Sequence, residues 1–234
     1  MTQSGSPLPH LTEEHSPQTI LRAGLQAAGG PVALACSFSV EDVVIIDLLQ
    51  EVDRSVRVFA LDTGRLNEET YEVAEAVRER YGIKIDWYFP KREAVETLER
   101  SKGLFSFRES LENRKECCRI RKIEPLGRAL EGLSGWITGL RREQSVTRDA
   151  IAPLESDAAH GGILKINPLT FWSSAQVWEY AESRRIPVNR LHRQGYPSIG
   201  CAPCTRAVQP GEDERAGRWW WENPEHKECG LHRR

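Results

Sequence analysis

The sequence has 234 residues, a length that fits one ordinary domain or one domain with a tail. Hydrophobic residues make up 39% and charged residues 28%, as in soluble globular proteins, and no apolar run is long enough to form a transmembrane helix. The formal net charge is -2 with both signs interspersed, which argues against duplex nucleic acid as a partner but leaves room for a small anionic ligand.

The N-terminal residues, 1–16, are polar and lack a basic stretch followed by an apolar one. We therefore predict a disordered tail, no signal peptide and a cytoplasmic location. The remaining sequence divides into a predicted α/β domain over residues 17–209 and a charged, aromatic C-terminal segment over residues 210–234. We expect this last segment to be mobile.

Short apolar runs alternate with longer helical patterns through the first half of the chain. We predict strands at 31–36, 56–61 and 83–89, and helices at 18–28, 43–52, 67–82 and 91–100. This order is typical of an α/β fold with a parallel twisted sheet flanked by helices. Ligands bind beyond the carboxyl ends of such strands, so the loops SFSVED (37–42) and LDTGRL (61–66) are the first candidates for a binding site.

The second half of the chain is less regular. A strand is predicted at 136–140, a strand or edge segment at 163–169, and a helix at 173–185. Beyond residue 186, proline, glycine, cysteine and tryptophan are frequent and there is little periodicity. The pattern of apolar residues does not predict the order of the strands in the sheet.

Two pairs of cysteines stand out: Cys117 next to Cys118, and Cys201 with Cys204 in a CxxC turn. Clustered cysteines in a cytosolic chain more often hold a metal or do chemistry than build a disulfide scaffold. Four thiolates suit either zinc or a [4Fe–4S] cluster. Adjacent cysteines point their side chains apart, which favours the larger cluster, with zinc as the alternative. Cys36 lies in an apolar strand and is assigned no role.

Several polar residues at predicted strand ends are suited to binding an anion. The first loop offers serine hydroxyls and backbone amides at a helix N-terminus, and arginines bind phosphate or sulfate through paired hydrogen bonds. Gly64 permits a tight turn. Each feature also has a plainer interpretation, a helix cap for the serines and a solvated charged face for the arginines. The residues concerned are Ser37, Ser39, Gly64, Arg65, Arg141 and Arg142.

A series of motifs resembles the phosphoadenylyl-sulfate and adenylyl-sulfate reductase family of assimilatory sulfate reduction. In chain order they are SFSVED, LDTGRL, ECCRIRKIEPL, TGLRREQS, YPSIGCAPC, RAGRWWWE and KECGLH. The resemblance extends from about Pro31 to His232, with Val40 standing where a smaller residue is commoner. It implies an adenine nucleotide alpha hydrolase fold related to the PP-loop pyrophosphatases. The cysteine pairs resemble the cluster-bearing branch, which mostly reduces adenylyl sulfate (APS).

The resemblance also implies a role for individual residues. Cys117, Cys118, Cys201 and Cys204 would bind a [4Fe–4S] cluster. Cys229 would be the nucleophile, and the basic residues around it favour its thiolate. The implied substrate-binding residues are Ser37, Phe38, Ser39, Asp62, Thr63, Gly64, Arg65, Lys122, Gly139, Arg141, Arg142, Gln144, Arg215, Arg218 and His232.

The implied reaction is the reduction of APS to sulfite and AMP through an S-sulfocysteine on Cys229. Because the chain ends soon after this cysteine and lacks the redox domain of plant relatives, an external thioredoxin is the expected electron donor. No nucleic acid or membrane partner is expected, and a homo-oligomer is compatible with the sequence.

Three alternatives remain open. The first is a cluster-bearing reductase of the 3′-phosphorylated substrate. The second is an ATP-consuming PP-loop enzyme, although its usual SGGxDS-type loop does not match SFSVED. The third is a redox sensor without enzymatic activity, which would leave the arginine loops and Cys229 unexplained.

Overall fold

A computed structural model describes residues 8–144, 151–223 and 230–231 of the chain. Its central sheet has six strands in the order β3-β2-β1-β4-β6-β5, and all neighbours are parallel except β5 and β6. The strands are β1 (Val32–Ala35), β2 (Arg57–Leu61), β3 (Ile85–Tyr88), β4 (Gly135–Ile137), β5 (Leu154–Asp157) and β6 (Ile163–Ile166). The predicted α/β fold with a parallel sheet is confirmed, and the antiparallel edge strand β5 is an addition.

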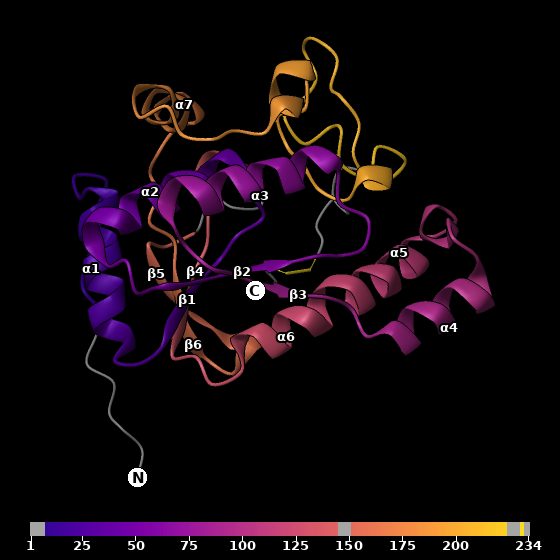
Figure 1. Ribbon diagram of the computed structural model, residues 1–234, viewed down its shortest axis with the longest axis horizontal. Coiled ribbons are helices and arrows are strands. Elements are labelled where there is room, and N and C mark those ends of the chain that lie inside the picture. Colours follow the sequence, from indigo (N-terminus) through magenta and orange to yellow (C-terminus); the bar gives the residue numbers. More distant parts are fainter. Residues whose placement is uncertain (1–7, 145–150, 224–229, 232–234) are drawn as a thin grey trace.

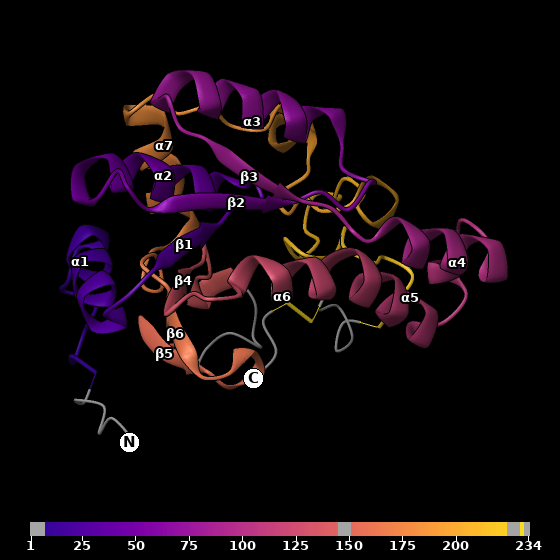
Figure 2. The same ribbon diagram turned by 60° about the horizontal axis from the view of Figure 1, so that its bottom comes forward.

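Helices cover both faces of the sheet (Figures 1 and 2). One face packs against α1 (Pro17–Ala28), α2 (Val40–Val52), α3 (Glu68–Tyr81) and α7 (Ser174–Ser183). The other face packs against α6 (Glu124–Leu130). The remaining helices, α4 (Arg92–Lys102) and α5 (Leu111–Cys118), lie beyond α6.

The central strands β1 and β4 are apolar throughout because successive side chains enter opposite cores. Ala33 of β1 packs with Phe59 and Trp136 against α6, whereas Leu34 of β1 and Ile137 of β4 pack on the α2 side. This alternation is the expected consequence of the two-residue period of a strand. A parallel sheet covered on both faces therefore gives short continuous apolar runs in the sequence.

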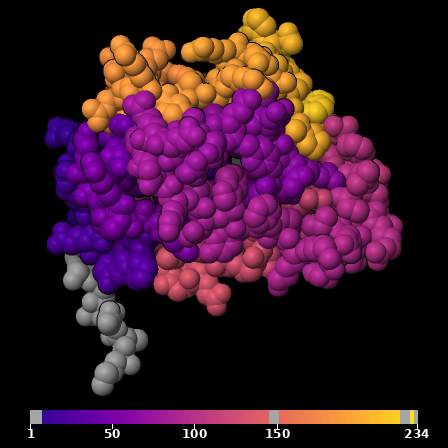
Figure 3. All heavy atoms as spheres, viewed as in Figure 1, coloured from indigo at the N-terminus to yellow at the C-terminus, as the bar shows by residue number. Residues whose placement is uncertain are grey.

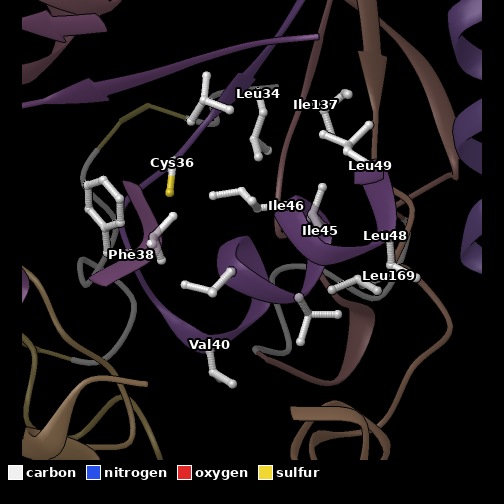
Figure 4. Packing of buried hydrophobic residues seen from close by; sticks show 14 of the residues in the cluster. Leu34, Cys36, Phe38, Val40, Ile45, Ile46, Leu48, Leu49, Ile137 and Leu169 are labelled. Atoms are coloured by element: carbon white, nitrogen blue, oxygen red, sulfur yellow. The ribbon is translucent and has the colours of Figure 1, made fainter. Parts of the chain in front are cut away.

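Helix α2 is the most deeply buried helix of the larger core (Figure 4). Figure 4 shows Ile45, Ile46 and Leu49 converging on Leu34, with the sulfur of Cys36 in the same group. The helix begins at Val40, three residues earlier than predicted, because the Ser39 carbonyl already accepts a hydrogen bond from the amide of Val43. Only the first part of the SFSVED motif is therefore a loop.

The predicted ends of two strands are wrong. The strand predicted at 136–140 stops at Ile137, and the one predicted at 163–169 stops at Ile166. Beyond these points, the Thr138 hydroxyl donates a hydrogen bond to Asn167 Oδ1 at 2.5 Å. Side chains therefore connect the two neighbouring segments after their strands end. A helical stretch was also missed: α5, a π-helical turn at Arg119–Ile123, and α6.

The strand order creates a switch point between β1 and β4. From β1 the chain moves outward through β2 and β3, and then returns to add β4 on the other side of β1. The crevice between diverging connections at such a point is where open α/β sheets bind ligands. The segment after α7, shown in orange and yellow in Figure 3, lies over one side of the molecule and contributes to this crevice. No helix in the described residues is both long and apolar enough to cross a membrane.

Candidate active site

A cavity of about 300 Å³ lies at the switch point. Its wall contains the loop after β1, the segment after β4, and parts of the segment after α7. Its volume is at the lower end of the range for small-ligand pockets, roughly 300–1,000 Å³. The predicted substrate-binding residues in this wall are Ser37, Ser39, Thr63, Lys122, Gly139, Arg141, Gln144, Arg215 and Arg218.

The loop after β1 is held in place by Asp42. Both the amide and the hydroxyl of Ser37 donate to Asp42 Oδ2, at 2.6 and 2.7 Å. Burial raises the pKa of Asp42 to about 6, against the lowering effect of these hydrogen bonds. Phe38 has a φ of 61° and stacks on Trp87 with ring centroids 5.6 Å apart, so it packs in the core and does not line the cavity.

The loop after β2 turns sharply at Gly64, which has a φ of +68°. The Gly64 amide donates to Asp62 Oδ1 at 2.7 Å, and the Tyr71 hydroxyl donates to Asp62 Oδ2 at 2.9 Å. Asp62 therefore organises the turn, and Thr63 is the residue of this loop that lines the large cavity. Arg65 lines a second, smaller cavity.

The two arginines after β4 have different environments. Arg141 is buried in the wall, and its Nη2 and Nε donate to Glu41 Oε1 at 3.0 and 3.1 Å. Gln144 Nε2 donates to the same oxygen at 2.9 Å. Arg142 does not line the cavity, and its guanidinium lies 4.7 Å from the ring centroid of Phe171. The adjacent pair therefore contributes only Arg141 to the cavity.

The second cavity, of about 20 Å³, brings together cysteines from distant parts of the sequence. Two of them end α5, where the chain enters the π-helical turn. Of the other two, Cys201 caps the short 3-10 helix at 202–204 and Cys204 is its last residue. In the part of the chain that the structure describes, no group of three histidine, cysteine or acidic side chains is arranged to hold a single metal ion. The thiol cavity is lined by Cys117, Cys118, Cys201 and Cys204.

Positive charge surrounds the thiol cavity. Burial opposes ionisation of Cys201, but the charge of Lys122, a hydrogen bond with Thr63 and the charge of Arg218 together hold the pKa of this thiol below its ordinary value. The Thr63 Oγ1 and Cys201 Sγ atoms are 3.2 Å apart. Burial raises the pKa of Cys204 to about 12, and the neighbouring charge of Cys201 adds to this effect. The cations thus favour the thiolate form of Cys201 more than that of Cys204.

The two cavities share part of their walls. Lys122, in the π-helical turn, lines both of them, and so does the buried ring of Trp219. The guanidinium carbon of Arg218 lies 4.6 Å from the centroid of the Trp219 ring, and its Nη1 donates to the Ile199 carbonyl at 3.2 Å. The same group of cations therefore acts on the large cavity and on the thiols.

Cys229 and His232 lie outside the residues that the structure describes. Leu231, two positions after Cys229, lines the large cavity and packs against the smaller hydrophobic core. Gly230 has a φ of +77°, in the left-handed region that glycine favours. Of the two described residues that follow Cys229, Leu231 is the one that lies in the cavity wall.

Acidic residues in the wall had no binding role in the sequence analysis. Glu41, Asp42 and Glu214 all line the large cavity. The first two belong to SFSVED and lie in the first turn of α2, where acidic residues are favoured. An acid within a loop predicted to bind an anion needs a hydrogen-bond or cationic partner, and this requirement is the signal that would have identified them.

Residues 31–207 match the family described as the phosphoadenosine phosphosulfate reductase domain. The chain belongs to this family. The adenosine 5′-phosphosulfate reductase of Allochromatium vinosum is 53% identical to it over 203 residues, which cover 87% of this chain and 79% of that relative.

Solved structures of the phosphoadenosine phosphosulfate reductase family and of more distant proteins share the fold. The phosphoadenylyl-sulfate reductase of Candida auris, in a phosphate complex, has a TM-score of 0.68 and 28% identity, covering 86% of this chain and all of that chain. The FMN adenylyltransferase of Candida glabrata, in complex with ATP, has a TM-score of 0.55 and 14% identity, covering 94% of this chain and 78% of that one. This second likeness concerns the fold alone.

Proposed function

We propose that this chain reduces adenosine 5′-phosphosulfate to sulfite and AMP. Two relatives that are 53% and 51% identical to this chain are named adenosine 5′-phosphosulfate reductase. The structural observation that carries the proposal is the wall shared by the two cavities. Lys122 and Trp219 line both the cavity at the switch point and the cavity lined by four thiols.

We further propose that a [4Fe–4S] cluster is held by Cys117, Cys118, Cys201 and Cys204. The donor set supports this, because four thiols from two segments line one cavity with cations around it. Adjacent cysteines such as Cys117 and Cys118 point their side chains apart, which favours a cluster over a single zinc ion. When bound, such a cluster supplies negatively charged sulfur beside the substrate cavity.

The cations of the large cavity suit the phosphosulfate group. Lys122, Arg141, Arg215 and Arg218 line the cavity together with Ser37 in the loop after β1. Arginine and lysine form charge-assisted hydrogen bonds with phosphate and sulfate oxygens. The same groups stabilise the charge that develops on the phosphate oxygen of AMP as it leaves.

In the proposed reaction, the Cys229 thiolate attacks the sulfur of the sulfuryl group. A bond between the two sulfur atoms forms, and the bond from that sulfur to the bridging phosphate oxygen breaks, so AMP leaves with the electron pair. One thiolate of a reduced thioredoxin then attacks Cys229 Sγ and releases sulfite. The second thioredoxin thiol resolves the mixed disulfide, so the dithiol supplies both electrons.

A thioredoxin donor agrees with the predicted cytoplasmic location, since dithiol proteins stay reduced in that compartment. Both the donor and the location remain predictions from the sequence.

Sulfite release under anaerobic conditions tests the proposed function. We expect turnover with APS and reduced thioredoxin, little with the 3′-phosphorylated nucleotide, and none in a Cys229→Ser variant that keeps its iron–sulfur absorption. Preference for the 3′-phosphorylated nucleotide would contradict APS as the substrate but would leave the proposed type of reaction intact. Absence of sulfite with either nucleotide, from protein with an intact cluster, would overturn the reaction itself.

A further inference from the structure

Glu99, near the end of α4, joins two arginines through a single carboxylate oxygen. Glu99 Oε1 lies 2.6 Å from Arg65 Nη2 and 2.6 Å from Arg121 Nη2. Arg65 belongs to the loop after β2, and Arg121 belongs to the π-helical turn between α5 and α6. One acidic side chain therefore connects three separate segments by hydrogen bonds between charged groups, which are stronger than those between neutral groups.

This triad of Glu99, Arg65 and Arg121 is largely shielded from solvent. The side chains of Arg121, Arg65 and Glu99 are 7%, 15% and 17% exposed. Arg121 Nη1 also donates to the Thr63 carbonyl at 2.7 Å, and the Arg65 guanidinium lies 5.0 Å from the centroid of the Phe107 ring. These contacts orient both guanidinium groups.

One carboxylate facing two guanidinium groups leaves the triad with a net positive charge. Within the described residues, Glu99 Oε2 and Arg121 Nε are buried without a hydrogen-bond partner. A buried charge is costly unless an opposite charge lies nearby. Both arginines line the thiol cavity, so the thiols face this excess positive charge.

We propose that Glu99 is a positioning residue that holds Arg65 and Arg121 against the thiol cavity, and so maintains the positive field around the group bound there. The inference rests on the proposed iron–sulfur cluster. Without the Glu99 carboxylate, Arg65 and Arg121 would lose their common anchor and the negative charge on the sulfurs would be less well balanced. The cluster should then be held less tightly.

The test compares wild-type protein with Glu99→Ala, Glu99→Gln and the matched control Glu96→Gln, all purified anaerobically with their cluster. Glu96 lies on the same helix but pairs with Arg92 at an exposed position. The measurements are iron and sulfide content, the rate at which a chelator bleaches the visible absorption, and the iron–thiolate bands in resonance Raman spectra. Circular dichroism checks the folding of each variant.

We expect Glu99→Ala to bleach roughly 10- to 100-fold faster, the usual cost of losing a group that supports metal ligands. Its iron–thiolate bands should shift. Glu99→Gln should lie between Glu99→Ala and wild type, because an amide oxygen still accepts hydrogen bonds without the charge, and Glu96→Gln should match wild type.

Wild-type bleaching rates and Raman bands in a folded Glu99→Ala protein would overturn the inference. If that variant does not fold, wild-type behaviour of Glu99→Gln in both measurements would overturn it instead. Wild-type protein that binds neither iron nor sulfide would contradict the proposed cluster, which is a separate and distinguishable failure.

Discussion

Two adjacent carboxylates, Glu41 and Asp42, lie in the wall of a cavity that we propose binds an anion. Each is engaged with donors of the same wall. Glu41 accepts hydrogen bonds from Arg141 and Gln144, and Asp42 accepts them from Ser37. At the residue scale, the acids therefore act as anchors that orient the groups available to a nucleotide, at the cost of some repulsion toward the nucleotide itself.

The pH dependence of AMP binding tests the role of Asp42. Burial raises its pKa to about 6. A bound anion disfavours the Asp42 carboxylate further, so binding of AMP is accompanied by proton uptake at Asp42. The affinity for AMP therefore increases as the pH falls through this pKa. We expect Kd to be about fivefold higher at about pH 8 than at about pH 5.5, equivalent to ~1 kcal/mol of screened repulsion.

The Asp42→Asn variant is the control for this prediction, measured by isothermal titration calorimetry with AMP. The phosphate of AMP also titrates, but it contributes equally to both proteins. The variant should therefore retain the phosphate contribution and lose the part due to Asp42. Identical pH profiles for Asp42→Asn and wild type would show that Asp42 does not affect binding.

At the scale of elements, the site depends on how closely the end of β4 approaches the start of α2. A Cβ atom added at Gly139 would lie 2.4 Å from Asp42 Oδ1 and 3.0 Å from the Cβ of Glu41. Real Cβ atoms do not come as close as the first of these distances. The glycine therefore allows the strand end and the helix N-terminus to form one wall of the cavity.

Substitution of Gly139 by alanine should separate these elements. We expect the Gly139→Ala variant to bind AMP about tenfold more weakly, ~1.4 kcal/mol, and to melt at a lower temperature. The matched control is Gly127→Ala in α6, where an added Cβ meets no atom within 4 Å. This control should bind AMP normally and gain about 0.5–1 kcal/mol of stability, because alanine favours a helix more than glycine does. Normal AMP binding by Gly139→Ala would contradict this account.

The sequence predicted some elements better than others, for identifiable reasons. The apolar β1, β2 and β3 and the helices between them follow clear periodicities. Helix α5 was missed because its sequence, LENRKECC, has few apolar residues and is stabilised by tertiary contacts, including the pair of Arg114 with Glu222 at 2.8 Å. The order of strands depends on pairing between distant segments, which the local pattern of apolar residues does not reveal.

At the scale of the whole molecule, residues far apart in sequence form two cavities that share part of their walls. The motifs identified the candidate residues but did not separate them into groups. Arg65 lines the thiol cavity, Arg141 lines the large cavity, and Arg142 lines neither, although all three are arginines after a predicted strand. The cavity that an arginine lines depends on its hydrogen-bond partner, which is Glu99 for Arg65 and Glu41 for Arg141. These partners lie close to the arginines only in the folded chain.

We expect substrate binding and sulfur transfer to occur at the large cavity. A nucleotide in the large cavity would lie near Leu231, which follows Cys229 by two positions in the sequence. The central claim is therefore that APS alone, without a reductant, transfers its sulfuryl group to this cysteine.

Intact mass spectrometry under anaerobic, non-reducing conditions tests this claim most directly. The protein, with its cluster, would be mixed with APS or with its 3′-phosphorylated analogue, and any adduct located by peptide mapping. We predict a single sulfonate adduct on Cys229 with APS, and none in the Cys229→Ser variant. An adduct on another residue, or no adduct from cluster-loaded protein with either nucleotide, would contradict the account.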